Sequence, residues 1–291
     1  IKTIVWTDTL QTLFMIVAVI LSIYFINESL DWSFGEFLAS NELKEYSKVF
    51  VTDSFLERSH FLKSFVGGMF ITICMTGLDQ DMMQKNLTCK SLKDAQKNMV
   101  SFSIVLVIVT FLFMLLGALL YIYANEHNIA MPLMDGQPRT DLLFPEIALN
   151  SGLGITLAIT FMLGLIAAAY SSADSALTSL TTSFCVDFLN IDKKPKEEQK
   201  SIRKKAHVGM SVMLVIVIII FKYVLTSNVI DSLLTVAGYT YGPLLGLFAF
   251  GIFTKYQVKD KYVWIVAVCS VILITIIGNI PPEKLGGYVL G

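Results

Sequence analysis

Seven long apolar stretches constrain this chain more than any other feature of its sequence. They lie near residues 4–26, 62–84, 99–124, 152–189, 206–225, 230–253 and 262–280. A helix needs about 20 mostly apolar residues to cross a bilayer, and all seven stretches are too long and continuous for barrel strands. Hydrophobic residues make up 55% of the chain and its mean hydropathy is +0.67, which argues against a soluble globular domain. The sequence therefore predicts an all-α, multi-pass membrane protein with about seven transmembrane helices.

The basic residues predict how these helices are oriented. Fifteen of the 22 lie near the N-terminus or in the segments that follow the second, fourth and sixth stretches, a set that includes Lys85. The positive-inside rule makes that side cytoplasmic. We therefore expect a protein of the plasma (inner) membrane whose chain starts in the cytoplasm and ends outside. Because the basic residues follow topology, they give no support for nucleic-acid binding.

The segment from Ala167 to Ser179, AAAYSSADSALTS, places hydroxyls and a carboxylate inside the fourth stretch. At 3.6 residues per turn, four small residues share one face with Asp174 at its border, namely Ala168, Ser171, Ser172 and Ser175. An ionisable residue in a membrane span usually faces a bundle interior or a wet cavity, which makes this segment a candidate cation site. The alternative is that the small residues only let helices approach closely.

Two other stretches contain interruptions of a helical pattern. In the second stretch Gly77 precedes Asp79, and in the sixth Pro243 lies among glycines spaced four apart. Proline removes a backbone donor and glycine weakens a helix, so both places are candidates for unwound or kinked segments. In secondary transporters, broken helices mark the substrate and ion sites near the membrane midplane.

Other chemistry finds little support in the sequence. It contains no H-E-x-x-H or G-x-S-x-G motif, and its three histidines lie outside the interiors of the spans (His60, His127 and His207), so we do not expect an enzyme. The four cysteines have no metal-ligand spacing and are expected to be packing residues. Because the chain enters a span at once and stops without a polar tail, we expect an internal piece of a longer protein.

Five segments in this order and spacing resemble the solute:sodium symporter family. They are IVWTDTLQTLFM, GLDQDMMQKNLTCKSLKDAQKNM, DLLFPEIAL, the AAAYSSADSALTS segment followed by FCVDFL, and YTYGPLLGLFAFGIFTK. The resemblance implies a core of ten helices in two inverted five-helix repeats, the 5+5 fold of the leucine transporter. Residues 1–291 would be a single, partial transporter domain that contains core helices five to ten and one following helix.

The resemblance also implies ligands for Na+. One site uses hydroxyls and a backbone carbonyl of core helix eight, here Ser171, Ser172 and the carbonyl of Ala168, together with carbonyls of core helix one. A second site, present in some members, corresponds to Asp8, Ser171, Asp174 and Ser175. Asp174 departs from the family pattern, which usually has Ser or Thr at this position.

Two carboxylates around one monovalent ion would overcompensate its charge. We therefore expect that Asp8 or Asp174 is protonated, that a proton accompanies the sodium, or that the two do not meet. Asp8 has an alternative role as a solvated residue at a helix start, where the helix dipole favours a negative charge.

By the same resemblance, the solute would contact Asp79 near the interruption of the second span and Thr235, Tyr239 and Tyr241 of the sixth. Asp79 stands where sugar-transporting members have Asn, and an acid there would favour a polyol, a sugar or a cationic group over a carboxylate. The tyrosines could equally be interfacial aromatics. The implied function is sodium-coupled symport of a small polar solute such as a sugar, sialic acid or an amino acid, by alternating access and with residues 127–151 as an external lid. The alternative is a transporter-like sensory module of a histidine kinase.

Overall fold

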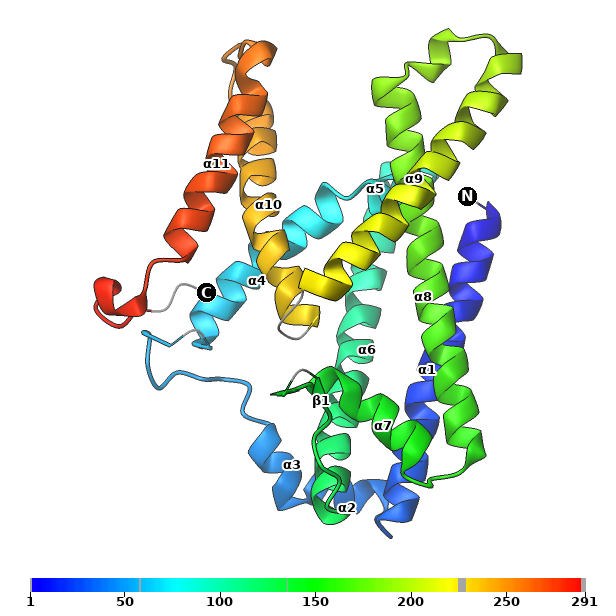
Figure 1. Cartoon of the computed structure of the whole chain (residues 1–291), viewed down its shortest axis with the longest axis vertical. Coiled ribbons are helices and arrows are strands. Elements are labelled where there is room, and N and C mark those ends of the chain that lie inside the picture. Colours follow the sequence, from blue (N-terminus) through cyan, green and yellow to red (C-terminus); the bar gives the residue numbers. More distant parts are fainter. Residues whose placement is uncertain (1, 58, 135, 225–228, 289–291) are drawn as a thin grey trace. The chain divides into compact units, whose positions relative to one another are not determined.

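The structure, a computed structural model, describes residues 2–57, 59–134, 136–224 and 229–288. Helices dominate these residues (Figure 1). The chain divides into two compact units, the first made of Ile1–Ser47 and Gln84–Asn228 and the second of Lys48–Met83 and Val229–Gly291. The division falls within the short helix α5 (Gln80–Leu87).

Besides the end of α5, the first unit contains helices from the N-terminal and middle parts of the chain. They are α1 (Lys2–Ser29), α2 (Phe34–Ala39), α3 (Asn41–Tyr46), α6 (Leu92–Glu126), α7 (Leu143–Asn150), α8 (Ile155–Ser183) and α9 (Lys196–Val224). A π-helical turn, Phe184–Phe188, extends α8, and two short strands, β1 (Leu133–Met134) and β2 (Gln137–Pro138), pair antiparallel before α7.

Helices α1 and α8 lie side by side, and a glycine lets them approach closely (Figure 1). A Cβ atom at Gly164 of α8 would lie 2.9 Å from the Cβ of Ala18 of α1, closer than real Cβ atoms come to one another. Where α1, α6 and α7 meet, Ile26, Leu119 and Ile147 are fully buried in one apolar cluster. This packing fixes the face of α8 that meets α1.

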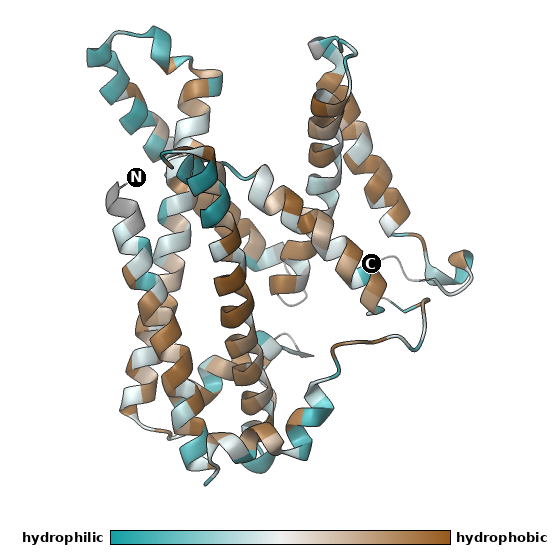
Figure 2. Cartoon of the chain, turned by 180° about the vertical axis from the view of Figure 1, so that it is seen from behind, coloured by the Kyte–Doolittle hydropathy of each residue, from teal (hydrophilic) through white to brown (hydrophobic). Residues whose placement is uncertain are grey.

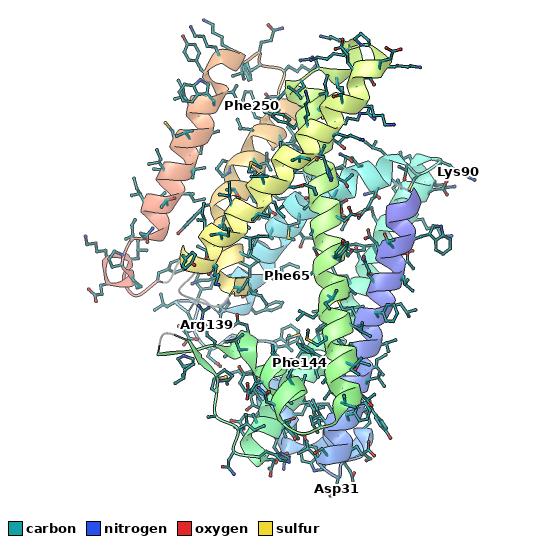
Figure 3. All side chains as sticks on the ribbon, turned by 45° about the vertical axis from the view of Figure 1, so that its right-hand side comes forward. Asp31, Phe65, Lys90, Arg139, Phe144 and Phe250 are labelled. Carbon is teal, nitrogen blue, oxygen red and sulfur yellow. The ribbon has the colours of Figure 1, made fainter. Side chains whose placement is uncertain are left out.

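Phe144 joins α7 to α8 at the end of this packed region. Its ring contacts the ring of Phe161 edge-on, with centroids 4.7 Å apart (Figure 3). Such an aromatic pair adds about 0.5–1.5 kcal/mol to the area that the rings bury. The contact holds α7 against α8 where the chain enters the long helix.

The segment between the first two spans contains the helices α2 and α3. Ser33 and Glu36 form a reciprocal capping box at the start of α2, in which the Ser33 hydroxyl accepts from the Glu36 N–H and the Glu36 carboxylate accepts from the Ser33 N–H. The hydrogen bond from the Ser33 N–H to the carboxylate is the largest cause that lowers the pKa of Glu36, and the interaction of the carboxylate with the Ser33 hydroxyl comes second. The S-x-x-E pattern is the sequence signal for this helix start.

The second unit contains α4 (Phe61–Gly77), α10 (Val229–Phe253) and α11 (Val263–Gly278). The Cys74 thiol of α4 lies 3.6 Å from the carbonyl oxygen of Tyr241 in α10. On α11, a Cβ at Gly278 would lie 3.4 Å from the ring of Tyr239. Helix α10 therefore contacts both other helices. It continues through Pro243, so the helix is not unwound there, and the kink expected as the other alternative stays a prediction.

All seven apolar stretches are helical. The middle sections of these helices are apolar, whereas the first part of α9 is polar (Figure 2). Among the described residues, five helices are long and apolar enough to cross a membrane, and six if the bent pair α4 and α5 forms one span. The seventh, α11, has only 16 residues, which at 1.5 Å per residue is about 24 Å. The expected count of seven is therefore one higher than helix length alone supports.

Many large apolar side chains on these helices are exposed. Ile218 of α9 and Phe248 of α10, for example, are 59% and 49% exposed. Exposed apolar surface of this extent is unfavourable in water and ordinary in lipid. The chain is thus an all-α, multi-pass membrane protein. All four cysteines are described and free.

Candidate cation site on α1, α5 and α8

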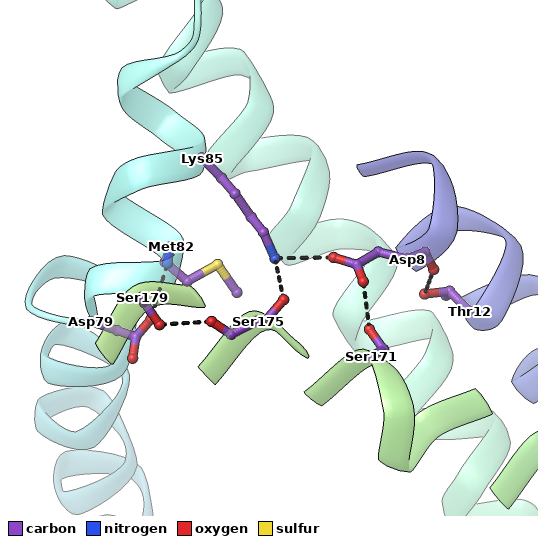
Figure 4. Close-up of polar contacts among 8 residues, drawn as sticks. All are labelled: Asp8, Thr12, Asp79, Met82, Lys85, Ser171, Ser175 and Ser179. Carbon is purple, nitrogen blue, oxygen red and sulfur yellow. Dashed lines mark hydrogen bonds and ion pairs between the residues drawn. The ribbon is translucent and has the colours of Figure 1, made fainter. Parts of the chain in front are cut away.

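Two serines of α8 carry the polar face of the site. Ser171 and Ser175 are four residues apart in an unbroken stretch of α8, so their side chains lie one above the other on the same side of the helix. Because α1 packs against α8, this face of α8 meets α1 at Asp8, near the N-terminal end of α1 (Figure 4). The hydroxyl of Ser171 donates a hydrogen bond of 2.8 Å to Oδ1 of the Asp8 carboxylate.

Lys85 completes the cluster. Its ammonium nitrogen is 3.2 Å from Oδ2 of Asp8 and 3.2 Å from the hydroxyl oxygen of Ser175 (Figure 4). The last residues of α5 belong to the same compact unit as α1 and α8. The side chain of Lys85 is 31% exposed and that of Asp8 is 20% exposed, while Ser175 is buried.

This geometry bears on the two expectations for Asp8. A solvated residue at a helix start would be exposed, whereas Asp8 is half-buried with one side-chain partner on α8 and another on α5. Charge-assisted hydrogen bonds of this kind are stronger than those between neutral groups. The Asp8 carboxylate therefore contributes to joining three helices.

The other predicted ion ligands lie along the same stretch of α8. Ala168 is half-buried and Ser172 is exposed. Asp174 is half-buried, and no hydrogen bond or ion pair joins it to another residue in the described part of the chain. Next to Ser175, the Ser179 hydroxyl donates to the Ser175 carbonyl at 2.8 Å and stays within its own helix.

The four predicted solute contacts all belong to the second compact unit. Asp79 lies at the break between α4 and α5, which meet at 56°, so the interruption expected near Gly77 is confirmed. Its Oδ1 accepts a 3.0 Å hydrogen bond from the N–H of Met82 (Figure 4), as a helix N-cap does. Thr235 is exposed, while Tyr239 and Tyr241 are half-buried in the packing of α10.

Sequence reasoning missed Lys85, which it counted only as a cytoplasmic basic residue. A signal was present, because Lys85 follows the predicted end of the second span by a single residue. A short helix after a break can turn a lysine back toward the bundle, and a long lysine stem can follow apolar surface to a polar partner.

Comparisons with known proteins decide the family. The family model for the "Sodium:solute symporter family" matches residues 1–277. The chain belongs to the sodium:solute symporter family. This membership agrees with the order of motifs in the sequence and with the expectation of a transporter family rather than an enzyme family.

Two curated relatives of this chain are sodium/sialic acid symporters. NanT of Aliivibrio fischeri is 24% identical over 263 residues, and the match covers 88% of this chain and 50% of the relative. SiaT of Proteus mirabilis is 24% identical over 269 residues, with coverage of 88% and 51%. The chain thus spans about half the length of these two relatives.

A solved structure establishes the fold of this chain. The substrate-bound outward-open state of a Na+-coupled sialic acid symporter matches with a TM-score of 0.71 at 20% identity, covering 94% of this chain and 61% of that one. The description of that structure includes a novel Na+ site. The chain is therefore part of a fold of the leucine-transporter type, as the motifs predicted.

Proposed function

We propose that the protein containing this chain is a sodium-coupled symporter of a small polar solute. One observation carries the proposal. Within apolar helices, the carboxylate of Asp8 on α1 accepts a hydrogen bond from the Ser171 hydroxyl of α8 and pairs with a positive charge, which the Ser175 hydroxyl of α8 also contacts. Polar groups inside a membrane bundle are costly and serve ion or solute pathways. Family membership supports the same function, whereas the relatives named above give no support for a sensory module.

The coupled Na+ would bind along α8 at the Ala168 carbonyl and the hydroxyls of Ser171 and Ser172. Hydroxyls and carbonyls replace the water around a hard monovalent cation without holding it too tightly for release. Further ligands would come from a core helix that the family resemblance assigns to a position before this chain. In this proposal, residues 1–291 form one transporter domain with core helices five to ten and one following helix.

The solute would be of the carbohydrate class. The named relatives are sialic acid symporters, which makes sialic acid the first compound to test. Neutral sugars and polyols should be tested next, because the Asp79 carboxylate near the solute would disfavour a second negative charge. Thr235, Tyr239 and Tyr241 would supply hydroxyls and aromatic faces from α10.

The proposed cycle is alternating access driven by the sodium gradient. Sodium would stabilise the outward-open arrangement and raise the affinity for the solute, and by linkage the solute would raise the affinity for sodium by the same factor. With the N-terminus of the chain in the cytoplasm, a potential of about 100 mV adds about 2.3 kcal/mol for each sodium charge moved fully inward. Residues 127–151 would cover the external vestibule.

Uptake by the full-length protein in proteoliposomes tests this function. We expect uptake of at least one compound from a panel of sialic acid, neutral sugars, polyols, amino acids and carboxylates, and we expect it to stop when choline replaces sodium. Ser172→Ala should raise the sodium concentration for half-maximal uptake about tenfold, because the loss of one oxygen ligand costs about 1.4 kcal/mol, similar to the loss of a hydrogen bond to a charged group.

The matched control for that variant is Thr182→Ala. Thr182 is an exposed hydroxyl on the same helix whose hydrogen bond goes to the Thr178 carbonyl within α8, so we expect an unchanged sodium dependence. Equal uptake rates in choline and sodium would overturn sodium coupling.

A further inference from the structure

A lysine ammonium occupies the polar cluster between α1 and α8. Lys85 donates to the Asp8 carboxylate and to the Ser175 hydroxyl, both at 3.2 Å, while Ser171 donates to the other oxygen of the carboxylate at 2.8 Å (Figure 4). Two oxygen-bearing side chains from two helices therefore contact one positive charge, and the Ser171 hydroxyl holds the carboxylate in place. That charge is delivered by α5, the short helix that follows the break in the second span.

An ammonium group and a sodium ion would interact with the same oxygen atoms of this cluster. Each carries a single positive charge, and each is satisfied by carboxylate and hydroxyl oxygens. Because the Asp8 and Lys85 side chains are 20% and 31% exposed, water screens charges here less than at an open surface. A second cation at the same oxygens would meet the repulsion of the ammonium at contact distance, so the two are alternatives.

The local charge count points in the same direction. Asp8 contributes one negative charge and Lys85 one positive charge, with 3.2 Å between the ammonium nitrogen and the carboxylate oxygen. The pair is therefore balanced without a second cation. Without the ammonium, the carboxylate charge would be left for a monovalent cation to balance.

We propose that Lys85 is a tethered cation that takes the place of a second coupled Na+ at the Asp8 carboxylate and the Ser175 hydroxyl, so that removal of its charge converts this cluster into a sodium site. The inference rests on the proposed sodium coupling. It makes Lys85 a determinant of how many sodium ions move with each solute, because a tethered charge is not released to the cytoplasm.

Counting bound sodium tests this role directly. Equilibrium binding of radiolabelled Na+ to the purified full-length protein in lipid nanodiscs gives the number of ions per protein. We expect Lys85→Met to bind one Na+ more than the wild type, and we expect Lys85→Met combined with Asp8→Asn to return to the wild-type number. Lys85→Arg keeps the charge and should leave the number unchanged.

The matched control is Lys90→Met. Lys90 is an exposed lysine five residues further along the chain (Figure 3), and its replacement should leave the count unchanged. A lysine that only stabilises the fold would lower expression or stability without adding a bound ion.

Asp8→Asn in the wild-type background keeps the proposal open to refutation even if Lys85→Met does not fold. We expect an unchanged sodium count, and a loss of one Na+ would mean that the cluster binds sodium despite Lys85. An unchanged count in a folded Lys85→Met protein would overturn the proposal as well. A wild type that binds no Na+ would instead refute the proposed function, which separates the two failures.

Discussion

The close approach of α1 and α8 at Gly164 makes a quantitative prediction. In Gly164→Ala, the added Cβ would lie 2.9 Å from the Cβ of Ala18. Carbon atoms in ordinary contact are about 3.5–4.0 Å apart, so the helices must separate by about 0.6–1.1 Å. Overpacking of this kind costs about 1–3 kcal/mol, and the better helix propensity of alanine offsets about 1 kcal/mol of it.

The reverse change at the facing residue should restore stability. Ala18→Gly alone should lose about 1 kcal/mol of helix propensity and about 0.8 kcal/mol for one buried methyl group. In the double variant the methyl group moves from one helix to the other, and its next neighbours at Gly164 are Met15 Cα at 3.7 Å and Phe14 O at 3.8 Å. These are ordinary contacts, so we expect stability within about 0.5 kcal/mol of the wild type.

The free energy of unfolding of the full-length protein in detergent micelles checks this cycle. The sum of the two single changes is about 2–4 kcal/mol of destabilisation, and nearly all of it should vanish in the double variant. Gly117→Ala on α6 is the control, because no described atom lies within 4 Å of the added Cβ. Additive losses in the double variant would show that these helices do not meet at Gly164 and Ala18.

Two further changes test local features. Asp79→Ala should destabilise α5 by about 1 kcal/mol, because the cap on the Met82 N–H is lost, and Asp79→Ser should keep most of that stability. Hydrogen exchange of the α5 amides measures this difference. Equal exchange in the two variants would contradict the capping role. Lys48, hydrogen-bonded to Asp53 at 2.5 Å, lowers the pKa of that exposed carboxyl. The ion pair therefore stabilises the fold at pH values above the ordinary aspartate pKa and is lost as pH falls through the lowered folded-state pKa. Asp53→Asn should remove that part of the acid dependence of unfolding, and an unchanged acid profile would count against it.

The sequence predicted the helical fold because its strongest signals are long and local. Apolar stretches of span length and the Gly77 break each depend on residues close together in the chain. The Ser33 to Glu36 capping pattern is a signal of the same local kind, which the sequence analysis overlooked. At Pro243 the helix α10 continues, so the chain is not unwound there. Neighbouring helices and local adjustment tolerate proline in membrane helices.

The cluster around Asp8 could be predicted only in part. Hydroxyls at helical spacing on α8 marked one face, and the family motifs linked that face to Asp8. Lys85 was missed because its contact with Asp8 joins residues 77 positions apart, and charge statistics along the chain describe topology rather than tertiary contacts.

The shortness of α11 has a consequence for the surrounding lipid. Its 16 residues reach about 24 Å, whereas a typical hydrocarbon core is about 30 Å thick. Tilting shortens the reach further, so the mismatch has to be taken up by the bilayer and by residues at the helix ends. Tyr262 and Trp264 are exposed at the start of α11, where amphipathic rings favour the headgroup region. The membrane beside this helix should therefore be locally thin, with a preference for lipids that have short or unsaturated acyl chains.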